Sequence, residues 1–301
     1  MKKCSVIIPT YNSEKYILRC LLSLSIQSVN DIEFIFVDDG STDRTIDIIK
    51  QFTSSDPRFK LISKHHSGVA DSRNLGLMKS SGKYIGWVDS DDYVPKRYFE
   101  TLIDSCEKNE SQISMCDMRV EHNGNYLFSY EILNENIRLS SHEALKLLCL
   151  DNSCKSWLTN KLFDRDLFSN INFPTLPALE DFAILHILFD KAKYIYYTKE
   201  TCYNLEQNQY SLTHNIKSEN VWQWVYVARD RYEYMLNHHP EFSSLSMACM
   251  TNFILLALNL QDNAIIDRNK KNFIRKYLFS ILYNKHISLT EKMQLLKIII
   301  K

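Results

Sequence analysis

Three carboxylates directly follow a short apolar segment and are the side chains in this sequence best suited to chemistry. Residues 83–88 have the composition of a buried strand, and Asp89, Asp91 and Asp92 come immediately after it. Oxygen ligands grouped in this way suit a divalent cation such as Mg²⁺ or Mn²⁺. A cation held by one or two carboxylates keeps coordination positions free for substrate phosphates. The segment therefore predicts a metal site that receives a phosphate-containing substrate.

The elements that position this segment alternate between strand and helix over the first ninety residues. Helices are expected after caps at Asn12 or Ser13 and at Ser41 or Thr42, and a third at about 69–79. This alternation implies right-handed crossovers and an α/β fold with a mostly parallel central sheet. The strands that alternate with them are predicted from short apolar runs at residues 5–8, 32–37, 60–63 and 83–88.

Polar residues follow each of these four predicted strands. Open parallel sheets bind ligands beyond the carboxyl ends of their strands, so the four loops are expected to meet at one edge. This arrangement places several functional groups around a single ligand site. The polar segments are residues 9–11, 38–40, 64–66 and 89–91.

The composition excludes several classes of protein. The 301 residues are 45% hydrophobic and 24% charged, which is ordinary for a globular chain. The formal net charge is zero, so no nucleic-acid partner is expected. The eight cysteines show no metal-ligand spacing and predict reduced thiols in a cytoplasmic protein. The longest apolar stretch, about 247–260, is interrupted by polar residues and predicts a buried core helix.

The remainder of the chain becomes less regular and then helical. Beyond Ser218 only helices are expected, and residues 268–301 contain nine Lys or Arg against one Glu. A basic helical end of this kind is compatible with self-association, with contact to an anionic membrane surface, or with a solvated outer face. Between the two regions, strands are predicted at 113–118, 126–133 and 194–197, and helices at 140–150 and 180–190.

Four motifs of the first ninety residues occur together in one order. They read SVIIPTYN at residues 5–12, VDDGSTD at 37–43, SRNLG at 72–76 and VDSDDY at 88–93. In order and spacing they resemble glycosyltransferase family 2, whose members are inverting enzymes with the GT-A fold. The resemblance is strong over residues 5–93 and extends more loosely to about residue 213. It implies a GT-A catalytic domain at 1–213, with a nucleotide-binding half at 1–110 and an acceptor half at 111–213, and a helical region at 214–301.

The resemblance also implies a nucleotide-sugar donor, usually a UDP-sugar, and roles for individual residues. Pro9 and Tyr11 would frame the base, and Asp39 would accept a hydrogen bond from uracil. Arg73 would approach the diphosphate or the donor sugar. From the residues alone, the alternatives are that the Asp38–Gly40 segment is a tight turn and that Arg73 is a surface residue of an amphipathic helix.

In the acidic motif, the resemblance implies that Asp89 and Ser90 meet the nucleotide and that Asp91 binds Mn²⁺ or Mg²⁺. Asp92 is expected to shape the loop or to reach the metal through water. A cation there would stabilise negative charge on the departing UDP as a Lewis acid. The adjacent His65 and His66 are expected to make loop or donor contacts rather than to bind metal.

An acceptor hydroxyl needs a base that removes its proton, and the second half of the chain offers Glu180 and Asp181. Inverting members of the family place such a pair beside the acceptor, which implies Asp181 as base and Glu180 as a supporting or orienting carboxylate. Adjacent carboxylates disfavour each other's ionisation, which raises one pKa. The alternative is a helix N-terminus decorated with acidic residues.

Two further segments resemble the family. Trp157 precedes the base pair in a Trp-x-x-x-Lys-Leu segment, and its indole is expected either to stack on an acceptor sugar or to lie in the core. Residues 207–213 resemble a segment that closes over the diphosphate, and Ser211 is the position expected to contact it. Many relatives carry arginine in this segment, whereas this chain has glutamines and Asn208.

The function expected from these features is inverting transfer of a hexose or N-acetylhexosamine from a UDP-sugar to a hydroxyl of a glycan, a lipid-linked acceptor or a glycoprotein. The cofactor expected is Mn²⁺ or Mg²⁺. The alternative is a non-catalytic nucleotide-sugar-binding subunit or scaffold of a glycosylation complex. A cytoplasmic protein at the inner face of the membrane is expected, with residues 214–301 available for homo-oligomer or peripheral membrane contact.

Overall fold

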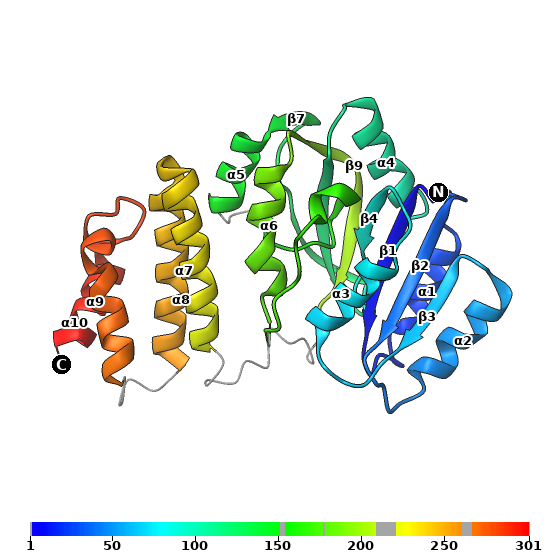
Figure 1. The fold of residues 1–301 in the computed structure, drawn as a ribbon, viewed down its shortest axis with the longest axis horizontal. Coiled ribbons are helices and arrows are strands. Elements are labelled where there is room, and N and C mark those ends of the chain that lie inside the picture. Colours follow the sequence, from blue (N-terminus) through cyan, green and yellow to red (C-terminus); the bar gives the residue numbers. More distant parts are fainter. Residues whose placement is uncertain (1, 151–153, 177, 209–220, 261–266, 301) are drawn as a thin grey trace. The chain divides into compact units, whose positions relative to one another are not determined.

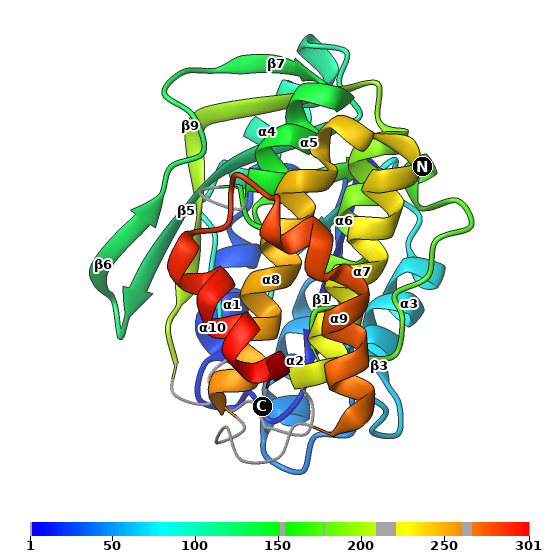
Figure 2. The ribbon, with the colours of Figure 1, turned by 90° about the vertical axis from the view of Figure 1, so that its left-hand side faces the viewer.

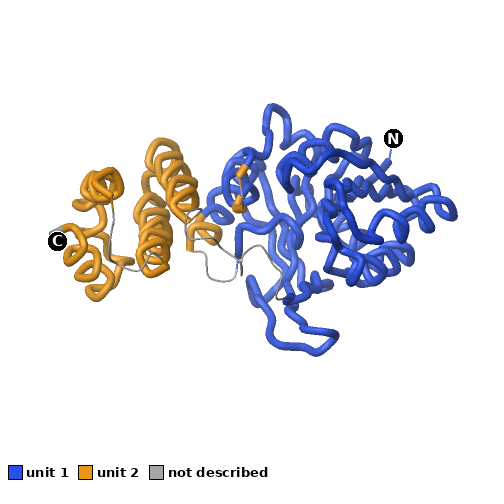
Figure 3. The backbone as a smooth tube through the Cα atoms, turned by 90° about the horizontal axis from the view of Figure 1, so that it is seen from below, with its two compact units in different colours: residues 1–145, 153–175, 180–209 blue, residues 146–152, 176–179, 210–301 orange. Residues whose placement is uncertain are grey.

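The structure is a computed structural model that describes residues 2–150, 154–176, 178–208, 221–260 and 267–300. The chain forms two compact units, which Figure 3 distinguishes by colour. Unit 1 contains residues 1–145, 153–175 and 180–209, and unit 2 contains residues 146–152, 176–179 and 210–301. The predicted boundary between residues 213 and 214 lies outside the described residues.

The first half of unit 1 alternates strand and helix as the sequence predicts (Figure 1). Its four strands are parallel and lie in the order β3-β2-β1-β4, and a helix connects each strand to the next. The elements are β1 (Cys4–Thr10), α1 (Ile17–Ser25), β2 (Ile32–Asp38), α2 (Thr45–Ser55), β3 (Phe59–Ser63), α3 (Val69–Lys79) and β4 (Tyr84–Trp87).

The second half of unit 1 continues the same sheet with mixed strand directions. β8 runs antiparallel to both β4 and β5, whereas β5 and β9 are parallel, and the full order is β3-β2-β1-β4-β8-β5-β9-β7. The predicted mostly parallel sheet therefore describes β1 to β4, and the strands beyond them form a mixed sheet. The elements are α4 (Tyr98–Lys108), β5 (Ile113–His122), β6 (Asn125–Tyr130), β7 (Ile137–Ser140), α5 (Ser141–Leu150), β8 (Lys161–Asp164), η1 (Arg165–Phe168), α6 (Glu180–Lys191) and β9 (Tyr194–Glu206).

One antiparallel pair, β5 and β6, is joined by a short connection. β6 pairs with β5 through a two-residue turn, in which Asn123 and Gly124 have positive φ angles of 50° and 79°. Such a turn favours asparagine and glycine because both of its central residues need positive φ angles. Figure 2 shows this hairpin extending from the sheet. Antiparallel neighbours need no helical crossover, so this half of the sheet departs from the βαβ pattern.

The core of unit 1 is built by strand residues that alternate between the two faces of the sheet. Val6 and Ile8 of β1 pack with Leu21 of α1 and Phe99 of α4 in one buried cluster. Ile7 points to the opposite face, against α3, so that helices cover both faces of β1. This burial on both faces explains why β1 and β2 consist almost wholly of apolar residues.

The described part of unit 2 beyond residue 220 is helical, as the sequence predicts. α7 packs against α8, and α9 packs against both α8 and α10. Residues Pro240–Leu260 are long and apolar enough by composition to cross a bilayer, but a packed core helix passes the same test, and 44% of this stretch is buried within the protein. The elements are α7 (Val221–His238), η2 (Pro240–Phe242), α8 (Ser243–Leu260), α9 (Arg268–Leu282) and α10 (Leu289–Ile300).

Candidate active site

The loops after β1 and β2 are joined by hydrogen bonds. The Asn12 backbone N–H donates to Ser41 Oγ at 2.9 Å, and the Thr42 N–H donates to Asn12 Oδ1 at 2.8 Å. The Ser13 N–H donates to Thr45 Oγ1 at 2.8 Å. The sequence predicts helix caps at Asn12 or Ser13 and at Ser41 or Thr42, but neither α1 nor α2 has a side-chain cap. These side chains instead satisfy backbone groups across the two loops, which fixes the end of β1 against the end of β2.

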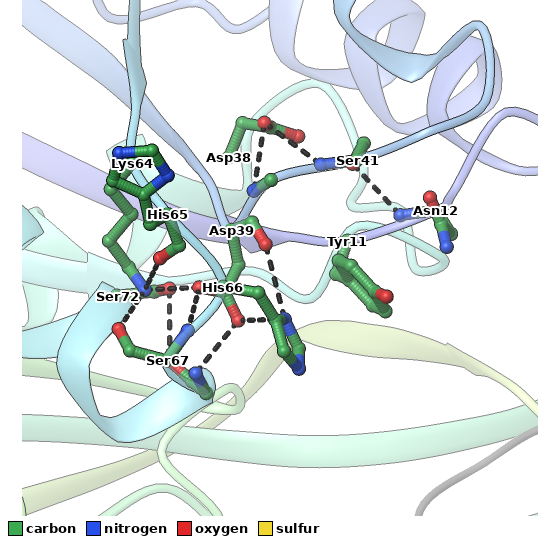
Figure 4. A network of polar contacts seen from close by, with 12 residues as sticks. Tyr11, Asn12, Asp38, Asp39, Ser41, Lys64, His65, His66, Ser67 and Ser72 are labelled. Atoms are coloured by element: carbon green, nitrogen blue, oxygen red, sulfur yellow. Dashed lines mark hydrogen bonds and ion pairs between the residues drawn. The ribbon is translucent and has the colours of Figure 1, made fainter.

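Asp39, directly after β2, is buried and surrounded by donors from the segment that follows β3 (Figure 4). Its carboxylate accepts from the backbone N–H of Ser67 at 2.8 Å and of Gly68 at 2.9 Å, and it forms an ion pair with Lys64. The ring nitrogen Nδ1 of His66 lies 3.0 Å from Asp39 Oδ2. Burial alone would raise the pKa of Asp39, but the Lys64 ammonium and the two N–H groups hold it below its ordinary value.

Tyr11 and His66 lie beside Asp39 and form an aromatic pair. Their ring centroids are 4.5 Å apart with an interplanar angle of 32°, and 46% of Tyr11 is exposed. Pro9 is buried within β1, two residues before this exposed ring. Asp38 accepts from the N–H groups of Gly40 and Ser41 at 3.2 Å each and thereby supports the loop after β2.

Arg73 is positioned by the close packing of α3 against β1. A side chain at Gly76 would meet Ile7 Cγ2 at 2.3 Å, so only glycine permits this approach. Arg73, one turn earlier on α3, is 6% exposed and is therefore not the surface arginine of the alternative interpretation. It forms an ion pair with Glu180, and its Nη2 lies 3.4 Å from Asp89 Oδ1. Its buried Nε has no hydrogen-bond partner among the described residues.

The acidic loop after β4 is held at several points. Ser90 Oγ lies 2.6 Å from Ser13 Oγ, which joins this loop to the loop after β1. Burial, with the nearby charge of Asp89, raises the pKa of Asp91 to about 7. Asp92 is buried and accepts from Tyr203 Oη at 2.6 Å, so it shapes the loop. Of the two roles expected for Asp92, these contacts favour support of the loop, while the roles of Asp89 and Asp91 stay predictions.

Four residues that the sequence analysis does not assign to the site hold the acidic loop. Arg19 of α1 donates to the Asp91 carbonyl at 2.9 Å, and Tyr203 Oη accepts from the Asp89 N–H at 3.1 Å. The Glu206 N–H donates to Asp92 Oδ1 at 2.8 Å, and the Glu206 carboxylate pairs with Arg19. The fourth residue is Asn208, whose Nδ2 lies 2.5 Å from Asp91 Oδ2.

Three of these four residues come from β9 or directly follow it. The sequence predicts that this strand ends at Tyr197, whereas β9 continues to Glu206 and thereby reaches the acidic loop. Asn208 belongs to the segment in which relatives carry arginine, and here it contacts the proposed metal ligand Asp91 directly.

The acidic pair Glu180–Asp181 begins α6. Leu179 immediately before it has a φ angle of 67°, an uncommon conformation for a side chain of this size. Glu180 is buried in its ion pair with Arg73, while Asp181 is half-buried. Burial raises the pKa of Asp181; the Arg73 guanidinium opposes this effect, and the charge of Asp89 adds to it. Asp89, Arg73 and the acidic pair therefore form one electrostatic cluster, built from β4, α3 and α6.

Trp157 and Ser211 are the remaining predicted site residues. Trp157 is half-buried against the hydrophobic core, and its ring lies 5.2 Å from that of Tyr130. Its carbonyl accepts from Lys161 Nζ at 2.7 Å, and this lysine lies near enough to Asp181 to lower the pKa of that carboxyl. The acceptor role of Trp157 stays a prediction. Ser211 lies outside the described residues.

Within the described parts of the chain, no group of three His, Cys, Asp or Glu side chains is arranged as a metal site. A cation in the acidic loop would be held by Asp91 together with Asp89; burial, with the negative charge of Asp89, raises the pKa of Asp91. Two carboxylates, with ligand oxygens completing the shell, are a donor set that Mg²⁺ and Mn²⁺ accept.

Comparison with known proteins identifies the family. The model of glycosyl transferase family 2 matches residues 5–171. An uncharacterized glycosyltransferase of Haemophilus influenzae is 30% identical over 234 residues, which is 77% of this chain and 90% of that protein. The uncharacterized glycosyltransferase EpsJ of Bacillus subtilis is 30% identical over 214 residues, or 69% of this chain. This chain spans 62% of EpsJ's length.

Solved structures agree in fold. Staphylococcus aureus TarS (residues 1–349), crystallised with UDP-GlcNAc, superimposes with a TM-score of 0.74 at 21% identity and covers 92% of this chain and 81% of that one. A mannosyltransferase of Pyrobaculum calidifontis, solved with GDP-Man and Mn²⁺, gives a TM-score of 0.55 at 15% identity over 99% of this chain and 85% of that one. The chain is thus a GT-A glycosyltransferase and belongs to glycosyltransferase family 2.

Proposed function

We propose that this glycosyltransferase moves a hexose or N-acetylhexosamine from a UDP-sugar to a hydroxyl group of a glycan, a glycolipid or a glycoprotein, with inversion at the anomeric carbon. The observation that carries this proposal is the position of Arg73. Its guanidinium pairs with Glu180 beside the proposed base and approaches Asp89 in the acidic loop. The groups proposed to bind the donor and to activate the acceptor therefore belong to one cluster.

Asp181 is the residue proposed to take the acceptor proton. A base is most effective when its pKa lies near the working pH, and burial moves the pKa of Asp181 in that direction. The nearby Arg73 guanidinium opposes this rise in the pKa of Asp181. The proton moves to Asp181 as the hydroxyl oxygen attacks the anomeric carbon and the bond to the diphosphate breaks.

The donor is proposed to bind along the edge formed by the loops after β1, β2 and β4. Tyr11 offers an exposed ring on which a base can stack, and Asp39 lies next to it. Arg73 has a buried Nε without a partner among the described residues, a group that a donor oxygen would satisfy. The crystal structure of TarS with UDP-GlcNAc supports a UDP-sugar as the donor class.

Asp91, with Asp89, is proposed to hold Mn²⁺ or Mg²⁺. When bound, such a cation supplies positive charge to the diphosphate that leaves. Asn208 and Arg19 keep Asp91 in place through its carboxylate and its carbonyl, respectively. The Mn²⁺ in the mannosyltransferase of the same fold supports this proposal.

A donor screen tests the function. The full chain is incubated with Mn²⁺ and, separately, UDP-glucose, UDP-galactose, UDP-N-acetylglucosamine or UDP-N-acetylgalactosamine, and UDP release is measured. We expect one donor to be turned over well above the others and the release to stop when the metal is chelated. Binding of these donors without release of UDP from any of them would favour the alternative of a non-catalytic nucleotide-sugar-binding subunit.

A further inference from the structure

The helix pair α9–α10 in unit 2 exposes large apolar side chains to an unusual degree. Phe279 is 72% exposed, Tyr283 is 76% exposed and Leu289 is 75% exposed, while Met293 is 47% exposed. The rings of Phe279 and Tyr283 form a tilted pair, with centroids 4.4 Å apart and an interplanar angle of 35°. Isolated exposed apolar residues are common, but a grouping of this kind marks a surface that contacts another apolar phase.

Helical geometry shows that this exposure is not the edge of a buried stripe. The buried residues of α9 include Tyr277 and Ile281, and Phe279 is two residues from each. Two residues correspond to roughly 200° around a helix, so Phe279 points away from the packed side. The same relation holds on α10, where Met293 is two residues from the buried Leu295. Each helix therefore has a second apolar row that unit 2 does not use.

The two exposed rows lie at the same end of the helix pair. Figure 2 shows α9 and α10 side by side with opposite directions, and Arg275 of α9 donates to the carbonyl of Ile299 near the end of α10 at 3.2 Å. The end of α9 therefore lies beside the beginning of α10. Phe279 and Tyr283 occupy the first of these positions, and Leu289 and Met293 the second.

Basic residues surround this surface. Residues 268–301 contain nine Lys or Arg and one Glu, whereas the whole chain has 36 of each sign, so the other residues carry 27 basic against 35 acidic side chains. Lys276 and Lys285 are exposed next to the apolar rows, and Lys276 also forms a solvent-exposed ion pair with Glu233 of α7 at 3.7 Å. A second copy of the chain docked symmetrically on this surface would bring two strongly basic regions together, which is unfavourable.

We propose that α9 and α10 dock this chain on an anionic lipid surface, with Phe279, Tyr283, Leu289 and Met293 inserted among the headgroups and the lysines paired with lipid phosphates. Apolar insertion and electrostatic attraction act together in such contacts. Tyrosine suits this position because its ring is apolar and its hydroxyl stays at the wet boundary. The surface is independent of the donor site, so the inference does not rest on the proposed reaction.

Vesicle flotation tests the proposal with the full chain. We expect the chain to float with vesicles of equal parts phosphatidylglycerol and phosphatidylcholine and to stay unbound with phosphatidylcholine alone. Added salt should weaken its binding to the anionic vesicles. The double variant Phe279→Ser/Tyr283→Ser should lose roughly tenfold or more in vesicle partitioning, because two large side chains no longer insert. Its matched control is Met78→Ser, which replaces a 69% exposed apolar side chain of unit 1 and should bind as wild type.

The charge contribution is measured separately. Lys276→Gln/Lys285→Gln should lower binding to the phosphatidylglycerol vesicles about 25-fold, since about 1 kcal/mol per lysine near an anionic surface corresponds to about fivefold each. Lys50→Gln/Lys96→Gln, a pair of exposed lysines in unit 1, should leave binding unchanged. All of these changes are on the surface, and circular dichroism and UDP binding verify that each variant is folded.

Three results would overturn the proposal. The first is failure of the wild-type chain to float with the anionic vesicles, and the second is equal binding to phosphatidylcholine alone. The third is wild-type partitioning of Phe279→Ser/Tyr283→Ser. Light scattering of the same samples without lipid identifies the competing occupant: a dimer that becomes monomeric in this double variant, together with no vesicle binding, would assign the surface to a second copy of the chain.

Discussion

Arg73 of α3 forms an ion pair with Glu180, the first residue of α6, and both side chains are buried. The pair joins the half of unit 1 that carries the acidic loop to the helix that carries the proposed base. Burying two charges is costly unless they meet, so this pair fixes the relative position of the two helices more than it adds stability. The geometry of the site therefore depends on it.

Replacing Glu180 by Gln should destabilise unit 1. The change leaves the buried guanidinium of Arg73 with Asp89 as its remaining charged partner, and breaking a buried pair in this way costs about 3 kcal/mol. The free energy of unfolding, measured in urea, checks this value. Glu135→Gln, at an exposed position, is the control and should change stability by less than about 0.5 kcal/mol. Equal stabilities of the two variants would show that the ion pair is not formed.

Asp91→Asn should remove the metal-dependent part of UDP binding. The amide keeps the size of the side chain but cannot supply the negative charge that a divalent cation requires. We expect UDP affinity with Mn²⁺ to fall to the value measured with a chelator. Titration calorimetry with and without Mn²⁺ provides the comparison, and Asp47→Asn on the exposed side of α2 is the control. An Mn²⁺ effect as large as that of the wild type would exclude Asp91 as a ligand.

Asp39 and the neighbouring His66 are expected to affect UDP binding differently, because of the hydrogen-bond donors around Asp39. A carboxylate offers about four lone-pair sites, and Lys64, Ser67, Gly68 and His66 already approach its oxygens. A uracil N–H that reaches Asp39 must replace one donor, and the His66 side chain is 60% exposed and thus the one free to move.

His66→Ala should therefore bind UDP at least as tightly as the wild type, whereas Asp39→Asn should bind it about tenfold more weakly, because a hydrogen bond to a charged group is lost. Affinities are measured by calorimetry, and melting curves verify that Asp39→Asn is folded. A loss in His66→Ala equal to that in Asp39→Asn would show that the imidazole holds the base directly.

Glu33 lies outside the candidate site, and its carboxyl is expected to make the free energy of unfolding depend on pH. This β2 residue is fully buried, and although burial alone would raise its pKa, hydrogen bonds from Lys60, Ser5 and Ser81 hold the pKa at about 2. Because the folded pKa lies below the unfolded value of about 4.5, the stabilisation is complete above that pH and is lost as the pH falls toward about 2.

The contribution of Glu33 at neutral pH should be on the order of 2 kcal/mol, discounted because half of the Lys60 side chain is in solvent. Unfolding in urea at several pH values between neutrality and about 3 tests this estimate. Glu33→Gln should be less stable at neutral pH and should lose less stability on acidification than the wild type. Parallel pH profiles for the two proteins would contradict the assignment.

The sequence predicts the parts of the fold that depend on local patterns. Apolar runs locate β1, β2 and β4 because these strands are buried on both faces, and α3 begins and ends at the predicted residues. The motif glycine Gly76 also has a local physical reason, namely the approach of α3 to Ile7. Because these strands are predicted to be parallel, the loops at their ends, and with them Asp39 and Asp89, could be placed at one edge of the sheet.

The elements and site contacts that the sequence does not predict are determined by contacts between residues distant in sequence. β8 has only four residues and is recognisable only by its pairing with β4 and β5. Helix α4 is not among the helices predicted from the sequence. Lys64 and Asn208 have ordinary polar side chains whose partners, Asp39 and Asp91, lie on other elements. The sequence marks the segments in which these two residues lie, but their contacts with Asp39 and Asp91 follow from tertiary structure.

The role of Asp181 is the central claim of this account, and one variant tests it most directly. Asp181→Asn keeps the shape of the side chain but removes the proton acceptor. Steady-state transfer with the best donor should fall by about 10²- to 10⁴-fold, the usual contribution of a general base, while the dissociation constant for UDP with Mn²⁺ stays within about twofold of the wild type. Asp166→Asn, at an exposed position, should retain full activity. Wild-type turnover by Asp181→Asn would contradict the account.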